Sequence, residues 1–193
     1  RAKNYYMPTY GESAYAPTPI YTLGRLPILL HAIRVDPDIV NDAEDILKMM
    51  EGSSAEATQR SWDRFGGPEI IRSISERYSL EQTRPGQTWS ETISTPVDIA
   101  RMYRRFFDDR EVSTPQKKWV MTILRKTSPT IMGEDFSWGL PNVMGVADSA
   151  EPPRDLGWVQ GYSPSGADPM IRATSGMVGD HMRYIVVIIK QYQ

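Results

Sequence analysis

The nucleophiles available to this chain are hydroxyl groups, because its 193 residues contain no cysteine. The absence of cysteine rules out disulfides, thiolate catalysis and thiolate metal sites. The two histidines, His31 and His181, stand far apart in sequence, which disfavours a His-rich metal site and leaves a Ser-His-Asp triad only if one of them serves. The chain contains no Ser-x-x-Lys either, the pattern that places an amine one helical turn from a serine. We expect neither a metal nor a cofactor.

Composition limits the partners. Hydrophobic residues make up 40% of the chain and aromatic residues 10%, enough for a sizeable core in one or at most two domains. The net charge of −2 gives no electrostatic case for binding nucleic acid, which needs clustered cations. The basic pairs Arg104–Arg105 and Lys117–Lys118 are too short to change this and are interpreted as solvated helix faces. The longest apolar stretches, 26–33 and 184–189, are far shorter than the roughly 20 residues of a membrane-spanning helix.

Helices are predicted over about residues 22–126, after an irregular or extended lead-in over residues 1–20. The first helix starts at Thr22, a plausible N-cap, and is apolar on most sides through Ile33. Further helices are expected over about 36–50, 55–65 and 68–78. A polar loop over residues 79–94 separates these from two helices with Thr-Pro start signals, at Thr95-Pro96 and at Thr114-Pro115.

The C-terminal part reads as strands. Residues 127–156 are rich in Pro, Gly and Asp and are expected to form loops, followed by strands within 157–192. The runs concerned are 157–162, 170–177 and 183–191. The segment 184–189 is apolar on both faces, which is typical of a covered central strand. Helices first and strands last predict an α+β fold, with helices packed on an antiparallel sheet.

This order of elements resembles that of class A β-lactamases and penicillin-binding proteins, over about residues 21–193. Those proteins carry Ser-x-x-Lys on a helix, then Ser-Asp-Asn, and then Lys-Thr-Gly on a strand. The segments that resemble these motifs and their surroundings are Tyr21–Leu30, Met49–Thr58, Phe65-Gly66-Gly67, Thr92–Ala100, Trp158–Tyr162, and Thr174-Ser175-Gly176 with Tyr184–Ile189. The resemblance implies one β-lactamase-like domain after the lead-in.

The first motif lacks the groups that this chemistry requires. At the nucleophile position stands Thr22, which keeps a hydroxyl on a stiff β-branched side chain. At the lysine position stands Arg25, whose guanidinium does not deprotonate in a protein and cannot act as the base. Two further interpretations remain open: Thr22 as a helix N-cap, and Arg25 as a surface residue or as a partner of Glu56 that plugs the cleft.

The second and third motifs are also altered. Ser53 is retained, but Ser54 and Ala55 stand where the resemblance implies Asp and Asn. Ser53 could equally hydrogen-bond the turn at Gly52. Val159 and Gln160 replace Lys and Thr and leave Gly161, so the amine that would hold a substrate carboxylate is missing. The region 79–94 has no Glu-x-x-x-Asn for deacylation.

These substitutions predict a catalytically degenerate homologue. The leading hypothesis is a non-catalytic module that binds a protein partner or a cell-wall ligand such as peptidoglycan. Its ligand groove would be lined by Trp158, Gln160, Tyr162 and Ser175. The alternative is a divergent hydrolase acting through Thr22 or Ser53. A third hypothesis, accidental resemblance, predicts that Thr22, Ser53 and Gly161 lie far apart.

The resemblance implies an extracytoplasmic protein of a bacterial, and in particular actinobacterial, envelope, attached through a segment outside this sequence or secreted. The related fold has N-terminal strands ahead of the nucleophile helix, and residues 1–20 hardly suffice for them. We therefore expect an incomplete sheet whose open edge invites a partner.

Overall fold

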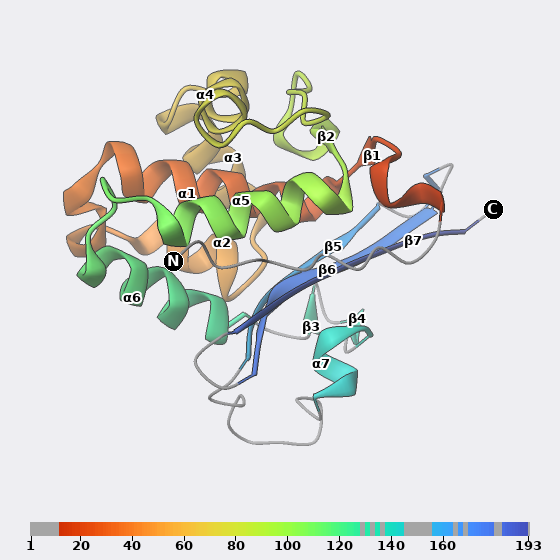
Figure 1. Ribbon diagram of the computed structural model, residues 1–193. Coiled ribbons are helices and arrows are strands. Elements are labelled where there is room, and N and C mark those ends of the chain that lie inside the picture. The colour runs from red at the N-terminus through yellow and green to blue at the C-terminus, as the bar shows by residue number, and fades with distance from the viewer. Residues whose placement is uncertain are drawn as a thin grey trace, which may run out of the picture.

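A helical layer packs on one face of a three-stranded antiparallel sheet in this computed structural model (Figure 1). The structure describes residues 12–127, 130–131, 134–135, 138–144, 156–163, 166–167, 170–179 and 183–192. The sheet order is β5-β6-β7. The predicted α+β class, with helices on an antiparallel sheet, is confirmed.

Most predicted helices are present. The α-helices are α1 (Arg25–Val35), α2 (Glu44–Met50), α3 (Ala55–Arg64), α4 (Pro68–Tyr78), α5 (Pro96–Asp108), α6 (Thr114–Arg125) and α7 (Leu140–Val143). Short 3₁₀ helices are η1 (Glu12–Tyr15), η2 (Tyr21–Gly24), η3 (Pro37–Asn41) and η4 (Trp89–Glu91). The expected second helix is therefore divided between η3 and α2.

The strands are β1 (Thr18–Pro19), β2 (Ile93–Ser94), β3 (Thr130–Ile131), β4 (Glu134–Asp135), β5 (Leu156–Tyr162), β6 (Met170–Val178) and β7 (Tyr184–Tyr192). The three C-terminal strands were predicted within a residue or two. Region 127–156 was expected to be all loop, but its described part includes β3, β4 and α7. The described part of the lead-in contains η1 and β1, and β1 pairs with β2.

Helix starts follow the local sequence signals. The Thr95 hydroxyl accepts a hydrogen bond from the Asp98 N–H at 3.0 Å and caps α5. Ser113 and Gln116 form a capping box at the start of α6. The Asp98 carboxylate, which is buried, also accepts bonds from the N–H groups of Glu81 and Gln82 and from the Thr83 hydroxyl. The start of α5 therefore also holds the beginning of the 79–94 loop.

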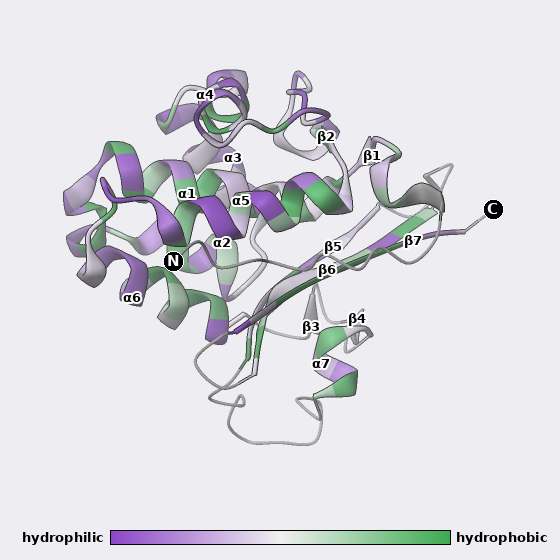
Figure 2. Ribbon diagram, viewed as in Figure 1, coloured by the Kyte–Doolittle hydropathy of each residue, from purple (hydrophilic) through white to green (hydrophobic). Residues whose placement is uncertain are grey.

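The core lies within the helical layer around α1 and continues to the sheet beneath α5 and α6. Every residue of α1 from Arg25 to Ile33 is buried, and Figure 2 shows α5 and α6 striped, with hydrophobic and hydrophilic residues alternating along each helix. Val159, Ser175 and Val187 form one cross-strand row. Val159 and Val187 pack into the core with the helices. Alternate residues of a strand point to opposite faces, so the neighbouring rows face away from the helical layer.

Two predictions about these elements are wrong. Thr22 does not cap a helix, because Tyr21–Gly24 form η2 and Gly24 is the N-cap of α1. Strand β7, expected in the centre, lies at an edge of the three-stranded sheet within the described residues, and β6 is central and largely buried. Hydropathy alone did not separate a central strand from an edge strand with two apolar faces. Within the described part of the chain, no helix is long and apolar enough to cross a membrane.

His31 generates a prediction about pH. It is buried in α1, and its Nδ1 has no hydrogen-bond partner among the described residues. Burial lowers the pKa of His31 to about 4, and the Arg34 cation acts in the same direction. The unfolded chain takes up this proton near pH 6.5, whereas the native state stays neutral until about pH 4. Stability should therefore fall as the pH drops through this window, by up to about 3 kcal/mol from this residue.

Urea denaturation at about pH 7 and about pH 4.5, with the original chain and with His31→Gln, measures this contribution. The variant should show a flatter pH dependence, whatever its stability at neutral pH. Parallel pH dependences for the two chains would contradict the prediction.

Candidate functional site

Thr22 lies against strand β5. Its Oγ1 accepts a hydrogen bond from the backbone N–H of Tyr162 at 2.9 Å and donates to the backbone oxygen of Gln160 at 3.4 Å. A Cβ on Gly161 would lie 2.8 Å from the Cβ of Leu23, so only glycine allows η2 to approach the strand this closely. Thr22 and Gly161, which the sequence analysis selected, are thus brought together by η2 and β5.

Arg25, one turn beyond Thr22, reaches the second motif. Its Nη1 donates to the Ser53 hydroxyl at 2.7 Å and, more weakly, to the Met49 backbone oxygen at 3.5 Å. The expected pairing with Glu56 is wrong. The Glu56 side chain is 90% exposed and lies 3.9 Å from Arg60, because it points outward from the first turn of α3. Among the described residues, no carboxylate forms an ion pair with Arg25.

The environment of Arg25 opposes its charge. The residue is 2% exposed, and its Nε has no hydrogen-bond partner within the described ranges. Burial lowers the pKa of Arg25 to about 10, with a smaller opposite effect from Tyr162. The guanidinium still carries its proton at neutral pH. It therefore remains a buried cation whose hydrogen bonds go to neutral oxygens.

These contacts contradict the hypothesis of accidental resemblance. That hypothesis required Thr22, Ser53 and Gly161 to be far apart, whereas Thr22 contacts the residues on either side of Gly161 and Arg25 links the same helix to Ser53. The structure therefore assembles the three segments that the resemblance selected.

Two residues beside these contacts have an unfavourable backbone conformation. Tyr21 has φ 43° and Ser53 has φ 53°, in the left-handed region that residues other than glycine rarely adopt. The only other such residue in the described part of the chain is Ser79, the C-cap of α4, where this conformation is common. Strain of this kind concentrates at functional sites. No sequence signal identified Tyr21, because β-branching, charge and hydropathy do not report φ.

Among the described residues, no group hydrogen-bonded to Thr22 or Ser53 can act as a general base. Both partners of the Thr22 hydroxyl are backbone groups, and the Ser53 hydroxyl accepts from a guanidinium. Access is also restricted, since Thr22 is 7% exposed, Ser53 4% and Val159 1%. Val159 packs in the core. Ala55 is exposed at the start of α3, and the neighbouring Ser54 hydroxyl caps that helix by accepting from the Ala57 N–H.

The predicted ligand groove is only partly assembled. Trp158, Gln160 and Tyr162 alternate along β5 and share the face turned away from the helices. Ser175 belongs to the opposite face, where its hydroxyl lies 3.1 Å from the Tyr103 hydroxyl of α5. Its inclusion in the groove is wrong, because the β5–β6 register pairs Ser175 with Val159. Trp158 and Gln160 are buried, so only the half-buried Tyr162 is accessible.

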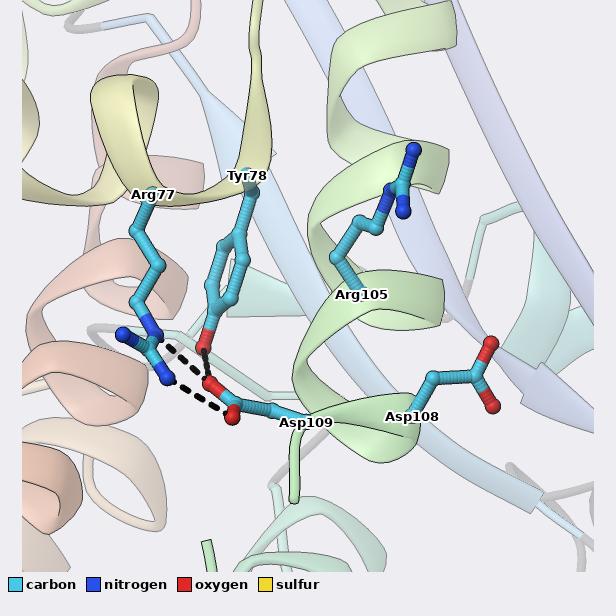
Figure 3. Close-up of a pocket in the computed structure, with 5 residues that line it drawn as sticks. All are labelled: Arg77, Tyr78, Arg105, Asp108 and Asp109. Atoms are coloured by element: carbon cyan, nitrogen blue, oxygen red, sulfur yellow. Dashed lines mark hydrogen bonds and ion pairs between the residues drawn. The ribbon is translucent and has the colours of Figure 1, made fainter. Parts of the chain in front are cut away.

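A separate cavity of about 350 Å³ lies between the ends of α4 and α5 and contains none of these residues (Figure 3). Arg77 donates to both oxygens of Asp109, at 2.7 and 2.8 Å, and also pairs with Glu111. The Arg77 guanidinium lowers the pKa of the Asp109 carboxyl. Tyr78, Arg105 and Asp108 complete the wall, and the Tyr78 hydroxyl donates to Asp109 at 3.4 Å. The carboxylate of Asp109 is thus already paired with two side chains of α4.

A metal site is not present in the described residues: they contain no group of three or more His, Asp or Glu side chains suited to hold an ion. His181, the second histidine of the sequence analysis, lies outside them.

Arg25 and Ser53 yield a stability prediction. Arg25→Met should raise the free energy of unfolding by about 1–3 kcal/mol, because an apolar side chain of similar length removes a charge buried without a carboxylate. Ser53→Ala should lower it by about 1–3 kcal/mol, because the guanidinium loses its shortest hydrogen bond. Urea denaturation measures both. Arg60→Met, which removes an exposed arginine paired with Asp45, is the control and should change stability by less than about 1 kcal/mol. A strongly destabilised Arg25→Met would contradict this view of the site.

Comparisons with known sequences give distant relatives. No family model matches the chain. Proteins named "Putative lipoprotein LppW" from Mycobacterium tuberculosis (strain ATCC 25618 / H37Rv) and Mycobacterium bovis are 28% identical over 144 residues, which is 72% of this chain and 44% of theirs. The chain thus spans less than half the length of these curated relatives.

Solved structures match more of the chain. PBP-A superposes with a TM-score of 0.64 at 16% identity, over 86% of this chain and 69% of its own. The β-lactamase from Streptomyces albus G gives 0.67 at 13% identity, over 93% and 78%. A β-lactamase from Xanthomonas campestris gives 0.66 at 12% identity, over 95% and 77%. At this coverage the likeness extends over both the helices and the sheet, and this chain has the fold of the serine β-lactamases and of PBP-A.

Proposed function

We propose that this chain is a non-catalytic β-lactamase-like module of the bacterial cell envelope, with a structural or regulatory binding role. The observation that carries the proposal is the hydrogen bond from the Arg25 guanidinium to the Ser53 hydroxyl at 2.7 Å. It joins the two positions at which acyl transfer in this fold would need a proton acceptor, and neither group can serve as one.

The loss of a base has a large effect on rate. General-base assistance contributes typically about 10²–10⁴-fold, and catalytic groups that act as a unit lose most of their effect when one is removed. In this chain the Thr22 proton points to a backbone oxygen. A carbonyl oxygen does not accept a proton at neutral pH, so the Thr22 hydroxyl has no route to an alkoxide.

Recognition of a substrate anion is missing as well. Among the described residues, the cation at these positions is Arg25, and its Nη1 donates to the Ser53 hydroxyl and to the Met49 carbonyl. Val159 stands at the position where the resemblance implies a lysine, and it is buried in the core. A carboxylate approaching β5 at this point would meet an isopropyl group.

The envelope location rests on the relatives. The mycobacterial proteins bear the name lipoprotein, and a protein of that kind is attached to a membrane by its lipid. We propose the same extracytoplasmic side for this chain. A protein partner in an envelope complex, or peptidoglycan, is the ligand class that we propose for it.

A divergent hydrolase is the second candidate, and two observations favour it. Thr22 follows the strained Tyr21, and its hydroxyl sits 2.9 Å from a backbone N–H of the kind that stabilises oxyanions. In this case Thr22 or Ser53 would form a covalent adduct, after a rearrangement that frees it from its present partners.

A fluorescent penicillin distinguishes the two candidates. The chain should form no adduct at Thr22 or Ser53 when digested and mapped by mass spectrometry after long incubation at high probe concentration. Turnover of a chromogenic cephalosporin should not exceed that of Thr22→Val, which keeps the shape of the side chain and removes the hydroxyl. An active class A β-lactamase is the positive control. Labelling that disappears in Thr22→Val, or in Ser53→Ala, would establish the hydrolase instead.

A further inference from the structure

Two cations lie side by side on the sheet face turned away from the helical layer. Arg172 of β6 and Lys190 of β7 are direct cross-strand partners, and both are exposed. None of the residues of β5, β6 and β7 is Asp or Glu. Neither cation forms an ion pair with any residue that the structure describes. This arrangement stands out in a chain that carries more acidic than basic residues.

Like charges directly opposite each other on paired strands destabilise a sheet. The Tyr192 ring lies beside both cations, with its centroid 4.6 Å from the Lys190 Nζ and 6.0 Å from the Arg172 Cζ. The ring holds both cations on its face. An anion bound between the two side chains would turn their repulsion into a shared attraction.

Exposed apolar side chains flank the cations on the same face. Met170, the cross-strand partner of Tyr192, is 46% exposed, and Ile188, two residues from Lys190, is 36% exposed. Cations, a tyrosine and exposed aliphatic groups together are the composition found where proteins meet the headgroup layer of a membrane. A soluble phosphate would engage the cations but leave Met170 and Ile188 in water.

We propose that this surface, made of Met170, Arg172, Ile188, Lys190 and Tyr192, docks on the anionic phospholipid headgroups of a bilayer. The phosphates would sit between Arg172 and Lys190, and the aliphatic side chains would enter the headgroup boundary. Basic residues near an anionic leaflet contribute about fivefold each, so the pair gives about 25-fold. Docking of this strength orients a protein that is already held at the membrane. The proposal does not depend on whether Thr22 reacts with a substrate.

Sedimentation with vesicles tests it. The chain should bind vesicles of phosphatidylcholine mixed with phosphatidylglycerol about 25-fold more strongly than vesicles of phosphatidylcholine alone, and added salt should weaken this binding. The double variant Arg172→Gln/Lys190→Gln should lose most of the preference. The matched control Arg105→Gln/Lys118→Gln, which changes two exposed cations on α5 and α6 and alters the net charge equally, should retain it.

Two further measurements distinguish binding to a bilayer from binding of a free anion. Ile188→Ser should weaken binding to the anionic vesicles, and inorganic phosphate should compete only through ionic strength, as an equal ionic strength of sodium chloride does. Circular dichroism confirms that each variant is folded. Equal binding to both kinds of vesicle, or loss of the preference in the Arg105/Lys118 control, would overturn the proposal. Specific competition by phosphate together with an unaffected Ile188→Ser would overturn it too, by making free phosphate the ligand.

Discussion

The contact between η2 and β5 is the constraint on which the site depends. The Thr22 hydroxyl accepts a hydrogen bond from the Tyr162 N–H and donates one to the Gln160 carbonyl. Between these two residues stands Gly161, where a side chain would collide with η2. Segments some 140 residues apart are joined here. The contact sets the direction in which α1 leaves the sheet, and with it the place where the arginine one turn later meets the second motif. The contact thereby joins the helical layer to the sheet at Thr22.

Arg25 changes the chemistry available one turn from Thr22, and its hydrogen bonds hold neighbouring segments together. A lysine in this position has an amine that burial can deprotonate, whereas a guanidinium keeps its proton even with a pKa near 10. Burying it without a carboxylate costs stability. The Arg25 guanidinium offsets part of that cost by hydrogen-bonding the Ser53 hydroxyl and the Met49 carbonyl. These bonds link α1 to the end of α2 and the segment that follows it. Such a bond supports a packed interior rather than proton transfer.

Much of this arrangement could be predicted from the sequence because its signals are local. Thr-Pro starts located α5 and α6, and the apolar run 184–189 located β7. The order of elements indicated the fold, which the chain shares with solved structures at only 13–16% sequence identity. Features that depend on contacts between distant segments could not be predicted from the sequence. The helix cap predicted for Thr22 was wrong because the hydroxyl bonds to a strand far along the chain. Ser175 was predicted on the wrong face because a shift of one residue in register reverses the face. The left-handed conformation of Tyr21 cannot be predicted from its residue type.

The buried carboxylate at the start of α5 has a consequence for the loop that follows α4. The Asp98 carboxylate accepts three hydrogen bonds from residues 81–83. Further along the same loop, the Trp89 carbonyl oxygen lies against Gly24, so closely that a Cβ on Gly24 would be only 2.6 Å from it. The first residues of the loop are therefore hydrogen-bonded to α5, and its later residues contact η2, which carries Thr22. Displacing the loop would remove three hydrogen bonds from a carboxylate that is almost fully buried. A ligand that approached Thr22 from the side of this loop would therefore have to displace the loop and disturb the start of α5.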